Sequence, residues 1–351
     1  PLHQKVMKIG NFIIDQNSPV FIIAELSANH NGSLDNALAT IKAAKRAGAD
    51  CIKLQTYTAD TITLDSDKED FVIKGTIWDG KKLHTLYQEA YTPWEWHEEI
   101  YHAAAAEGLI CFSSPFDHTA VDLLESLNSP AYKIASFEIT DIPLIEYVAS
   151  KGKPVIISTG IAQEEDIVLA LDACHRMGNY DIALLKCTSS YPAPIEEANM
   201  CMVKDLAERY QVISGLSDHT LGSTVPIVAT VFGAKIIEKH FIIDRAIGGP
   251  DASFSMNEAE FTAMVKAVRE AEKAIGVVDY HLTEKQAKGK DFSRSLYIAE
   301  DVKAGEVFTE RNIRSVRPGF GLHPKYYHQV LGKTAKVAVE KGTRFSLDFI
   351  V

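Results

Sequence analysis

The stretch Pro154-Val155-Ile156-Ile157-Ser158-Thr159-Gly160 decides the fold of this chain. Its apolar residues are continuous and β-branched rather than alternating with polar ones, which is typical of a strand buried on both faces. A helical pattern follows directly over residues 164–177. One buried strand followed by one helix is the repeating unit of parallel α/β architectures.

The same unit recurs along most of the chain. Ser33 is expected to cap a helix that ends at Gly48, and Thr92-Pro93-Trp94-Glu95 predicts a capping box with proline in the first turn of another helix. Eight units of this kind predict an α/β fold, the (β/α)8 TIM barrel. A doubly wound sheet is the competing architecture, but no GxGxxG follows the first run. The eight predicted strands are residues 20–26, 51–57, 109–116, 131–136, 154–160, 182–189, 212–219 and 234–241.

Two segments interrupt this order. Residues 58–91 form a long excursion after the second strand, and loops of this length are typically functional lids or small insertions. After the last helical pattern, residues 277–292 are polar and indicate a linker. Residues 293–351 contain only short apolar runs separated by turn signals. The predicted organisation is therefore a barrel domain at 1–276, a linker at 277–292 and a small β-rich domain at 293–351.

Composition restricts the class of function. The 351 residues carry 36 Lys and Arg against 47 Asp and Glu, a formal charge of −11, which argues against a general binder of nucleic acid or of anionic membranes. No apolar run approaches the ~20 residues that span a bilayer, and the first residues lack the apolar core of a secretory signal. The five cysteines are odd in number and lack CxxC spacing, so we expect reduced thiols and a cytoplasmic location.

Polar side chains collect where the predicted strands end, and barrel active sites lie at that end of the strands. Lys53 and Gln55 share one strand face because they are two residues apart. Lys53, Lys133 and the hydroxyls of the neighbouring strand ends suit a ligand with a phosphate and a carboxylate. A Schiff-base aldolase that uses Lys53 or Lys133 stays open as an alternative.

Two histidines at the ends of the last two strands, His219 and His240, are expected at similar height on neighbouring strands. Neutral imidazoles in this arrangement are plausible ligands for Mn, Fe, Co or Zn rather than Ca. The spacing alone leaves ordinary hydrogen-bonding histidines as an equal alternative. The histidines on helical patterns are expected at the surface; they are His97, His102, His118 and His175.

Several strand-end strings together resemble one family. They are Glu25-Leu26-Ser27-Ala28-Asn29-His30-Asn31-Gly32-Ser33, Lys53-Leu54-Gln55-Thr56, Ser113-Ser114-Pro115-Phe116, Tyr132-Lys133-Ile134-Ala135-Ser136, Ser158-Thr159-Gly160, Gly215-Leu216-Ser217-Asp218-His219-Thr220 and Glu238-Lys239-His240-Phe241. Nearly the whole chain is similar to the nonulosonic (sialic) acid synthases. Its tail, with Arg317-Pro318-Gly319, resembles the antifreeze-like (SAF) domain of that family.

The resemblance implies a condensation of phosphoenolpyruvate with the open-chain aldehyde of an N-acetylated sugar, giving a nine-carbon 2-keto acid and phosphate. It implies a divalent metal, Mn²⁺ before Mg²⁺ or Co²⁺, held by His219 and His240. It also implies a domain-swapped homodimer in which Arg317 of the partner subunit reaches the sugar. For proton transfer we expect Glu25, with Glu138 as the second choice.

The same resemblance assigns the substrate-binding residues. Glu138, Tyr191 and Asp251 are expected to contact the sugar, and Gln55 lies beside Lys53 in the substrate site. The residues expected to hold phosphoenolpyruvate are Lys53, Ser114, Lys133, Ser136, Ser158, Ser189 and Ser217.

Within the family, the chain resembles the branch whose acceptor is 2,4-diacetamido-2,4,6-trideoxy-altrose. The neuraminic branch typically has Ile-Gly-x-Asn-His after the glutamate, where this chain has Leu26-Ser27-Ala28-Asn29-His30. It also has Gly-Ser-Gly-Glu in place of Ala135-Ser136-Phe137-Glu138, and an apolar Phe137 would suit a sugar whose C6 is a methyl group. N-acetylmannosamine or its 2,4-diacetamido analogue as acceptor, as in neuraminic and legionaminic acid synthases, and a non-enzymatic binding module stay open as alternatives.

Overall fold

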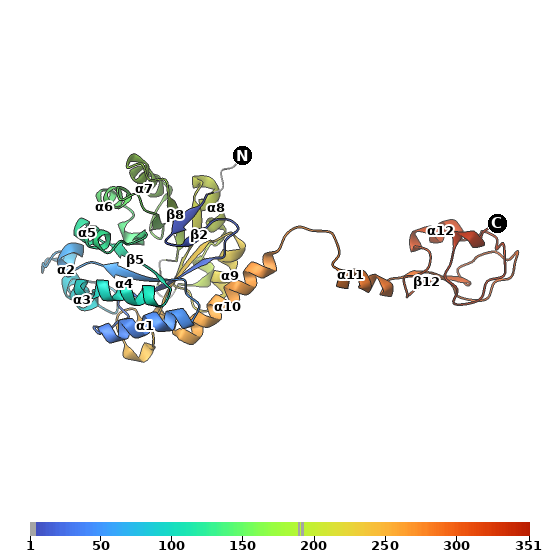
Figure 1. Ribbon diagram of the computed structural model, residues 1–351, viewed down its shortest axis with the longest axis horizontal. Helices are drawn as coiled ribbons and strands as arrows, with labels where there is room; N and C mark the ends of the chain where they lie inside the picture. The colour runs from blue at the N-terminus through green and yellow to red at the C-terminus, as the bar shows by residue number, and fades with distance from the viewer. Residues whose placement is uncertain (1–4, 189, 191–192) are drawn as a thin grey trace. The chain divides into compact units, whose positions relative to one another are not determined.

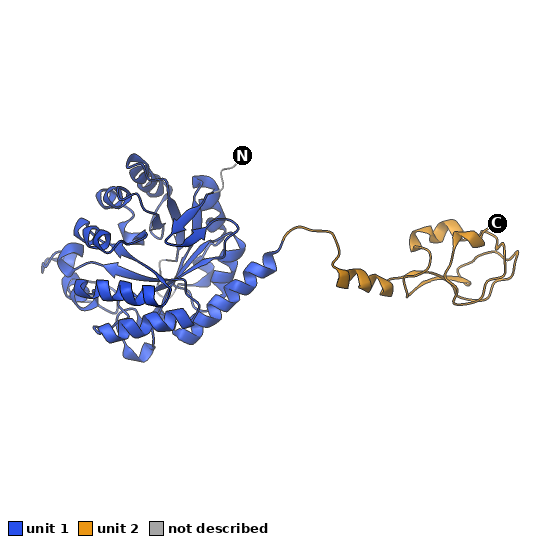
Figure 2. Ribbon diagram, viewed as in Figure 1, with its two compact units in different colours: residues 1–276 blue, residues 277–351 orange. Residues whose placement is uncertain are grey.

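A computed structural model describes residues 5–188, 190 and 193–351 of the chain (Figure 1). The chain divides into two compact units, Pro1–Gly276 and Val277–Val351 (Figure 2). The first unit holds a parallel barrel, and the second is a smaller β-rich fold with a hydrophobic core of its own.

Eight parallel strands close into a barrel in the first unit, which confirms the predicted architecture. The strands follow one another around the barrel in chain order, and β10 pairs with β3 to close it. All their C-terminal ends therefore meet at one mouth. The strands are β3 (Phe21–Glu25), β4 (Cys51–Thr56), β5 (Ile110–Pro115), β6 (Tyr132–Ile134), β7 (Val155–Ser158), β8 (Ile182–Cys187), β9 (Ile213–Asp218) and β10 (Ile236–His240).

The opposite end of the barrel is apolar. An antiparallel hairpin of β1 (Met7–Ile9) and β2 (Phe12–Ile14) packs its buried side chains into the same core cluster as Phe21 and Phe112 from the strands. Between β9 and β10 the backbones approach so closely that a Cβ atom on Gly215 would lie 2.2 Å from the carbonyl oxygen of Ile236. The polar mouth thus rests on a tightly packed apolar interior.

Helices cover the outside of the barrel (Figure 1). They are α1 (Leu34–Arg46), α4 (His97–Ala106), α5 (His118–Ser126), α6 (Ile142–Ala149), α7 (Glu164–Arg176), α8 (Cys201–Tyr210), α9 (Thr224–Val231) and α10 (Glu258–Ile275). Ser33 caps α1 as predicted, since its side chain accepts from the amide of Asn36.

The start of α4 differs from the prediction. A 3-10 turn, η2 (Trp94–Trp96), precedes the helix, and no side-chain capping bond forms at Pro93, so the capping box at Thr92 is wrong. The turn is held by a tertiary contact, because Trp94 Nε1 donates to the carbonyl oxygen of Tyr57 at 3.1 Å. The surface prediction for His97 is also wrong, since His97 is fully buried and its Nε2 bonds Thr56 Oγ1 at 2.8 Å.

The excursion at residues 58–91 carries two helices, α2 (Ala59–Ile62) and α3 (Leu83–Ala90), and a 3-10 turn, η1 (Glu69–Phe71). A β-bridge between Val72 and Lys82 closes its central loop. Four further 3-10 turns lie in loops that follow barrel strands. They are η3 (Ser136–Glu138), η4 (Ile195–Glu197), η5 (Arg245–Ile247) and η6 (Ala252–Phe254).

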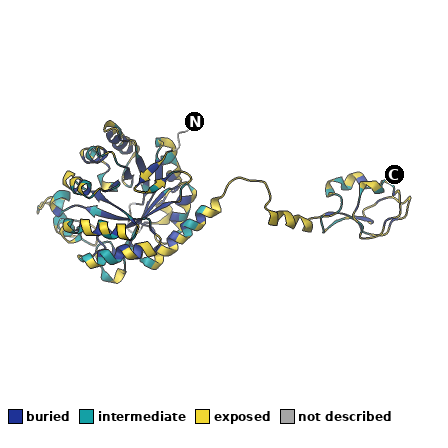
Figure 3. Cartoon of the chain, viewed as in Figure 1, coloured by how far each residue is buried: buried dark blue, intermediate teal, exposed yellow. Residues whose placement is uncertain are grey.

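The second unit is built on an antiparallel pair, β11 (Ser295–Ile298) and β12 (Ile313–Val316). Around this pair lie η8 (Pro324–Tyr326), α12 (Tyr327–Val330) and η9 (Leu347–Phe349). Residues 277–292, predicted as a linker, contain α11 (Glu284–Gly289) and η7 (Lys290–Phe292), and all are exposed (Figure 3). Within the described part of the chain, no helix is both long and apolar enough to cross a membrane.

Candidate active site

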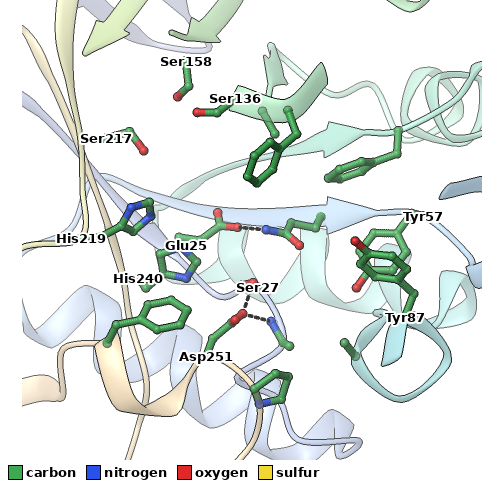
Figure 4. Close-up of a pocket in the computed structure, with 18 of the residues that line it drawn as sticks. Glu25, Ser27, Tyr57, Tyr87, Ser136, Ser158, Ser217, His219, His240 and Asp251 are labelled. Carbon is green, nitrogen blue, oxygen red and sulfur yellow. Dashed lines mark hydrogen bonds between the residues drawn. The ribbon is translucent and has the colours of Figure 1, made fainter. Parts of the chain in front are cut away.

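A cavity of about 710 Å³ opens at the C-terminal mouth of the barrel. Figure 4 shows that its side chains differ from one end to the other. Ser158, Ser217, His219 and His240 come from strand ends and make one end polar, whereas Tyr57 and Tyr87 lie at the opposite end. Glu25 lies between these two groups.

Four buried charged side chains line the polar end. Lys53 Nζ lies 3.0 Å from Glu25 Oε2 and 3.3 Å from Glu238 Oε1. Lys133 Nζ lies 3.3 Å from the same Glu238 oxygen. Two acids and two bases balance each other's charge where all four side chains are buried, and Glu238 connects both lysines.

Burial and the neighbouring charges set the pKa values of these four groups. Burial raises the pKa of Glu25 to about 7, against the opposite effect of Lys53. For Glu238 the effect of burial is outweighed by Lys133 and Lys53, and the pKa is lowered well below its usual range. Burial lowers the pKa of Lys133, whereas at Lys53 Glu238 and Glu25 outweigh burial and raise the pKa. We call these four side chains the charge quartet, and within it the neighbouring charges favour the charged forms of Lys53 and Glu238.

Serine hydroxyls surround the lysines. Ser217 Oγ donates to Glu238 Oε2 at 3.1 Å, and Lys53 Nζ donates to Ser114 Oγ at 3.2 Å. Ser158 Oγ is buried and has no hydrogen-bond partner among the described residues. A buried hydroxyl without a partner, in the same cavity as two buried lysines, indicates a polar ligand that completes its bonding.

The two strand-end histidines lie together as expected, with ring centroids 5.2 Å apart. His219 Nδ1 bonds the carbonyl oxygen of Thr188, so Nδ1 carries the proton and Nε2 is the nitrogen with the lone pair. His240 Nδ1 is buried and finds no hydrogen-bond partner in the parts of the chain that the structure describes. Burial lowers the pKa of both rings, which keeps them neutral. Two neutral imidazoles fit a divalent transition metal.

No group of three or more His, Cys, Asp or Glu side chains suited to a metal occurs among the described residues. A metal at His219 and His240 would therefore take its remaining ligands from water or substrate, as catalytic rather than structural metal sites do.

The carboxylates nearer the aromatic end are less paired. Gln55 Nε2 donates to Glu25 Oε1 at 3.0 Å. Asp251 accepts from Ser27 Oγ and from the amide of Ala28. Glu138 is half-buried in η3, and burial together with Asp141 raises its pKa to about 7.

Aromatic rings form the outer end of the cavity. The Tyr57 ring packs edge-on against Tyr87 of α3 and against Phe116 after β5, with centroid distances of 5.7 and 5.2 Å. Trp78 from the excursion and Phe137 from η3 also line the cavity, and Phe137 is 63% exposed. This end suits apolar groups such as methyls.

The arrangement has counterparts among known proteins. The NeuB family model matches residues 40–280, and the SAF domain model matches residues 293–351. The chain belongs to the NeuB family. It is 51% identical to the pseudaminic acid synthase of Campylobacter jejuni strain NCTC 11168, covering 96% of this chain and 97% of that protein.

Two further relatives of this NeuB-family chain are more distant. The N,N′-diacetyllegionaminic acid synthase of the same strain is 35% identical, over 90% of this chain and 95% of that protein. The crystal structure of the spore coat polysaccharide biosynthesis protein SpsE from Bacillus subtilis has a TM-score of 0.68 and 34% identity, with 99% of each chain covered.

The structure brings most of the predicted site residues of this NeuB-family chain into the cavity. Those that line it are Glu25, Lys53, Gln55, Lys133, Ser136, Glu138, Ser158, Ser217, His219, His240 and Asp251. Ser114 is buried and bonded to Lys53. Ser189 and Tyr191 lie outside the described residues, and Arg317 follows β12 in the second unit.

Sequence reasoning assigned no role to Glu238, which the structure places between both lysines. The signal was present, because Glu238 is two residues from His240 on one strand and shares its face. The adjacent Lys239 faces away as expected, but it is buried and pairs with Asp218 at 2.6 Å. Of the aromatic end, sequence reasoning named Phe137, but not Tyr57, Tyr87 and Phe116, because these rings come from separate segments that no local pattern joins.

Proposed function

We propose that the protein is a pseudaminic acid synthase. It condenses phosphoenolpyruvate with the open-chain aldehyde of 2,4-diacetamido-2,4,6-trideoxy-β-L-altropyranose and water, giving pseudaminic acid and phosphate. The observation that carries the choice of acceptor is the difference between 51% and 35% identity to two synthases of one organism. The apolar outer end of the cavity, which suits a C6 methyl group, supports it.

Phosphoenolpyruvate binds at the polar end. Lys53 and Lys133 face its phosphate and carboxylate, and Ser114, Ser136, Ser158, Ser189 and Ser217 supply oriented hydroxyls. The unpartnered hydroxyl of Ser158 and the two buried lysines support this assignment.

His219 and His240 hold a divalent metal, Mn²⁺ before Mg²⁺ or Co²⁺. When bound, the metal polarises the aldehyde oxygen of the acceptor as a Lewis acid. His219 is oriented for this by Thr188, whose carbonyl oxygen fixes the tautomer of the ring.

The reaction forms one carbon–carbon bond and breaks one carbon–oxygen bond. The enol C3 of phosphoenolpyruvate attacks the aldehyde carbon, and the cationic C2 that results takes up water. Loss of phosphate from C2 then gives the 2-keto acid. Glu25 takes one proton from the attacking water and passes it to the alkoxide formed from the aldehyde, with Glu138 as the second candidate. The other water proton leaves with the phosphate, whose departure the two lysines stabilise.

The acceptor lies toward the aromatic end. Glu138, Asp251, Gln55 and Tyr191 bond its polar groups, and Phe137 faces its methyl group. We further propose a domain-swapped homodimer in which Arg317 of the partner subunit contacts an acetamido group. The cysteines of the described chain are free, and four of the five are buried, which fits a reducing compartment such as the cytoplasm.

The test is turnover with phosphoenolpyruvate and each of three acceptors, the altrose derivative, N-acetylmannosamine and its 2,4-diacetamido analogue, with products identified by NMR. We expect the altrose derivative to react fastest, EDTA to abolish turnover and Mn²⁺ to restore it. Faster turnover of N-acetylmannosamine would contradict the acceptor assignment. Activity that survives EDTA, with a lysine trapped by borohydride, would instead favour a Schiff-base aldolase, for which the lowered pKa of Lys133 is the supporting observation.

A further inference from the structure

Ser27, two residues after the end of β3, has a backbone conformation that favours glycine. Its φ angle is +49°, in the left-handed region that side chains with a Cβ atom adopt at a cost. Ser27 is 4% exposed and lines the cavity. A serine at this position therefore carries a backbone cost that a glycine would not.

What serine supplies is a hydroxyl that bonds Asp251. Ser27 Oγ donates to Asp251 Oδ2, and the amide of Ala28 donates to the same oxygen at 3.3 Å (Figure 4). The turn that carries Asp251 is held by the same segment. Asn29 Nδ2 donates to Ser255 Oγ at 2.8 Å, and Ser255 Oγ donates to the carbonyl oxygen of Asp251 at 2.6 Å.

We propose that Ser27 is a positioning residue, which fixes the Asp251 carboxylate for the acceptor sugar. Both donors go to the same oxygen, Oδ2, so together they fix the orientation of the carboxylate in the cavity. With glycine at position 27 the backbone would relax, but only the longer bond from Ala28 would orient the carboxylate. This inference rests on the proposed function, since it names the acceptor as the ligand of Asp251.

The test compares Ser27→Gly with Asn31→Gly. Asn31 has a φ of +48° and bonds the same loop through Ile247, but it is exposed and does not line the cavity. Both variants relieve the backbone, so we expect melting temperatures equal to or above that of the wild type. A hydrogen bond to a charged group predicts a rise of about tenfold in the acceptor KM for Ser27→Gly, with the KM for phosphoenolpyruvate within about twofold. Asn31→Gly should leave both KM values unchanged.

A double-mutant cycle with Asp251→Asn separates positioning from a direct role. If Ser27 acts through Asp251, Ser27→Gly adds nothing further to the acceptor KM of Asp251→Asn. An unchanged KM in Ser27→Gly, or effects that add fully in the cycle, would overturn the proposal while wild-type turnover still supports the proposed function. A wild-type enzyme that does not use the acceptor would refute the proposed function and this inference together.

Discussion

Glu138 combines a place in the cavity with an unfavourable environment for its charge. Burial, and then the nearby Asp141, raise its pKa to about 7. The pKa of Glu138 is higher in the folded state than in the unfolded state. The contribution of Glu138 to the stability of the fold is therefore greatest below pH 4.5, where the group is protonated in both states. That stability is lost as the pH rises through 7. Such a residue lowers the free energy of unfolding at neutral pH, but it keeps a carboxyl group where it can contact a ligand.

Glu138→Gln tests this reading without reference to turnover. We expect its melting temperature to exceed that of the wild type at pH 8 and to match it at pH 4.5, because glutamine removes only the cost of ionisation. Glu25 and Glu138 both have a pKa raised to about 7. If the carboxylate of Glu138 binds the acceptor, the acid limb of kcat/KM near pH 7 should become shallower in the variant, because only Glu25 still titrates there. A variant that is equally stable at both pH values relative to wild type would show that Glu138 ionises without cost.

At the scale of elements, the contact between β9 and β10 is the tightest constraint on the mouth. These strands carry Ser217 and Glu238, and Gly215 lets their backbones meet. We expect Gly215→Ala to lower the free energy of unfolding by about 3 kcal/mol, because the new methyl group would meet a backbone carbonyl that has no room to move. Denaturant titration measures the loss.

Gly289→Ala is the matched control for Gly215→Ala. Gly289 ends the exposed helix α11, and a Cβ atom there meets nothing within 4 Å. The expected change is small and stabilising, since alanine favours the helix. Equal effects of the two substitutions would show that the close approach of β9 and β10 is not what limits position 215.

The elements also show how far sequence reasoning reaches. The eight strands were predictable because burial on both faces leaves a continuous apolar pattern within each one. Most of the predicted site residues that line the cavity could be found for a similar local reason, because they stand where these apolar patterns end. The 3-10 start of α4 and the burial of His97 depend on Tyr57 and Thr56, some forty residues away. The bond from Ser27 to Asp251 joins residues 224 positions apart, which no local pattern records.

For the whole molecule, a net charge of −11 coexists with a proposed anion site. The charge quartet makes this possible, because the positive charges of its two lysines are paired with the buried carboxylates of Glu25 and Glu238 and not with carboxylates at the surface. The surface charge then bears on solubility and on the exclusion of polyanions, while the site depends on buried partners. Binding of an anion at the mouth of the barrel therefore depends on these buried side chains and not on the net charge of the chain.

The proposed domain swap makes a prediction that only the assembled molecule can test. Chains with His240→Ala keep Arg317 but lose a metal ligand, whereas chains with Arg317→Ala keep an intact barrel. Each variant alone should be nearly inactive. In a mixed dimer with swapped tails, the barrel of the Arg317→Ala chain receives Arg317 of the partner subunit, so one of its two sites is complete. Random mixing by joint refolding should restore about a quarter of wild-type activity. If each tail serves its own barrel, the mixed dimer contains no complete site and mixing restores nothing.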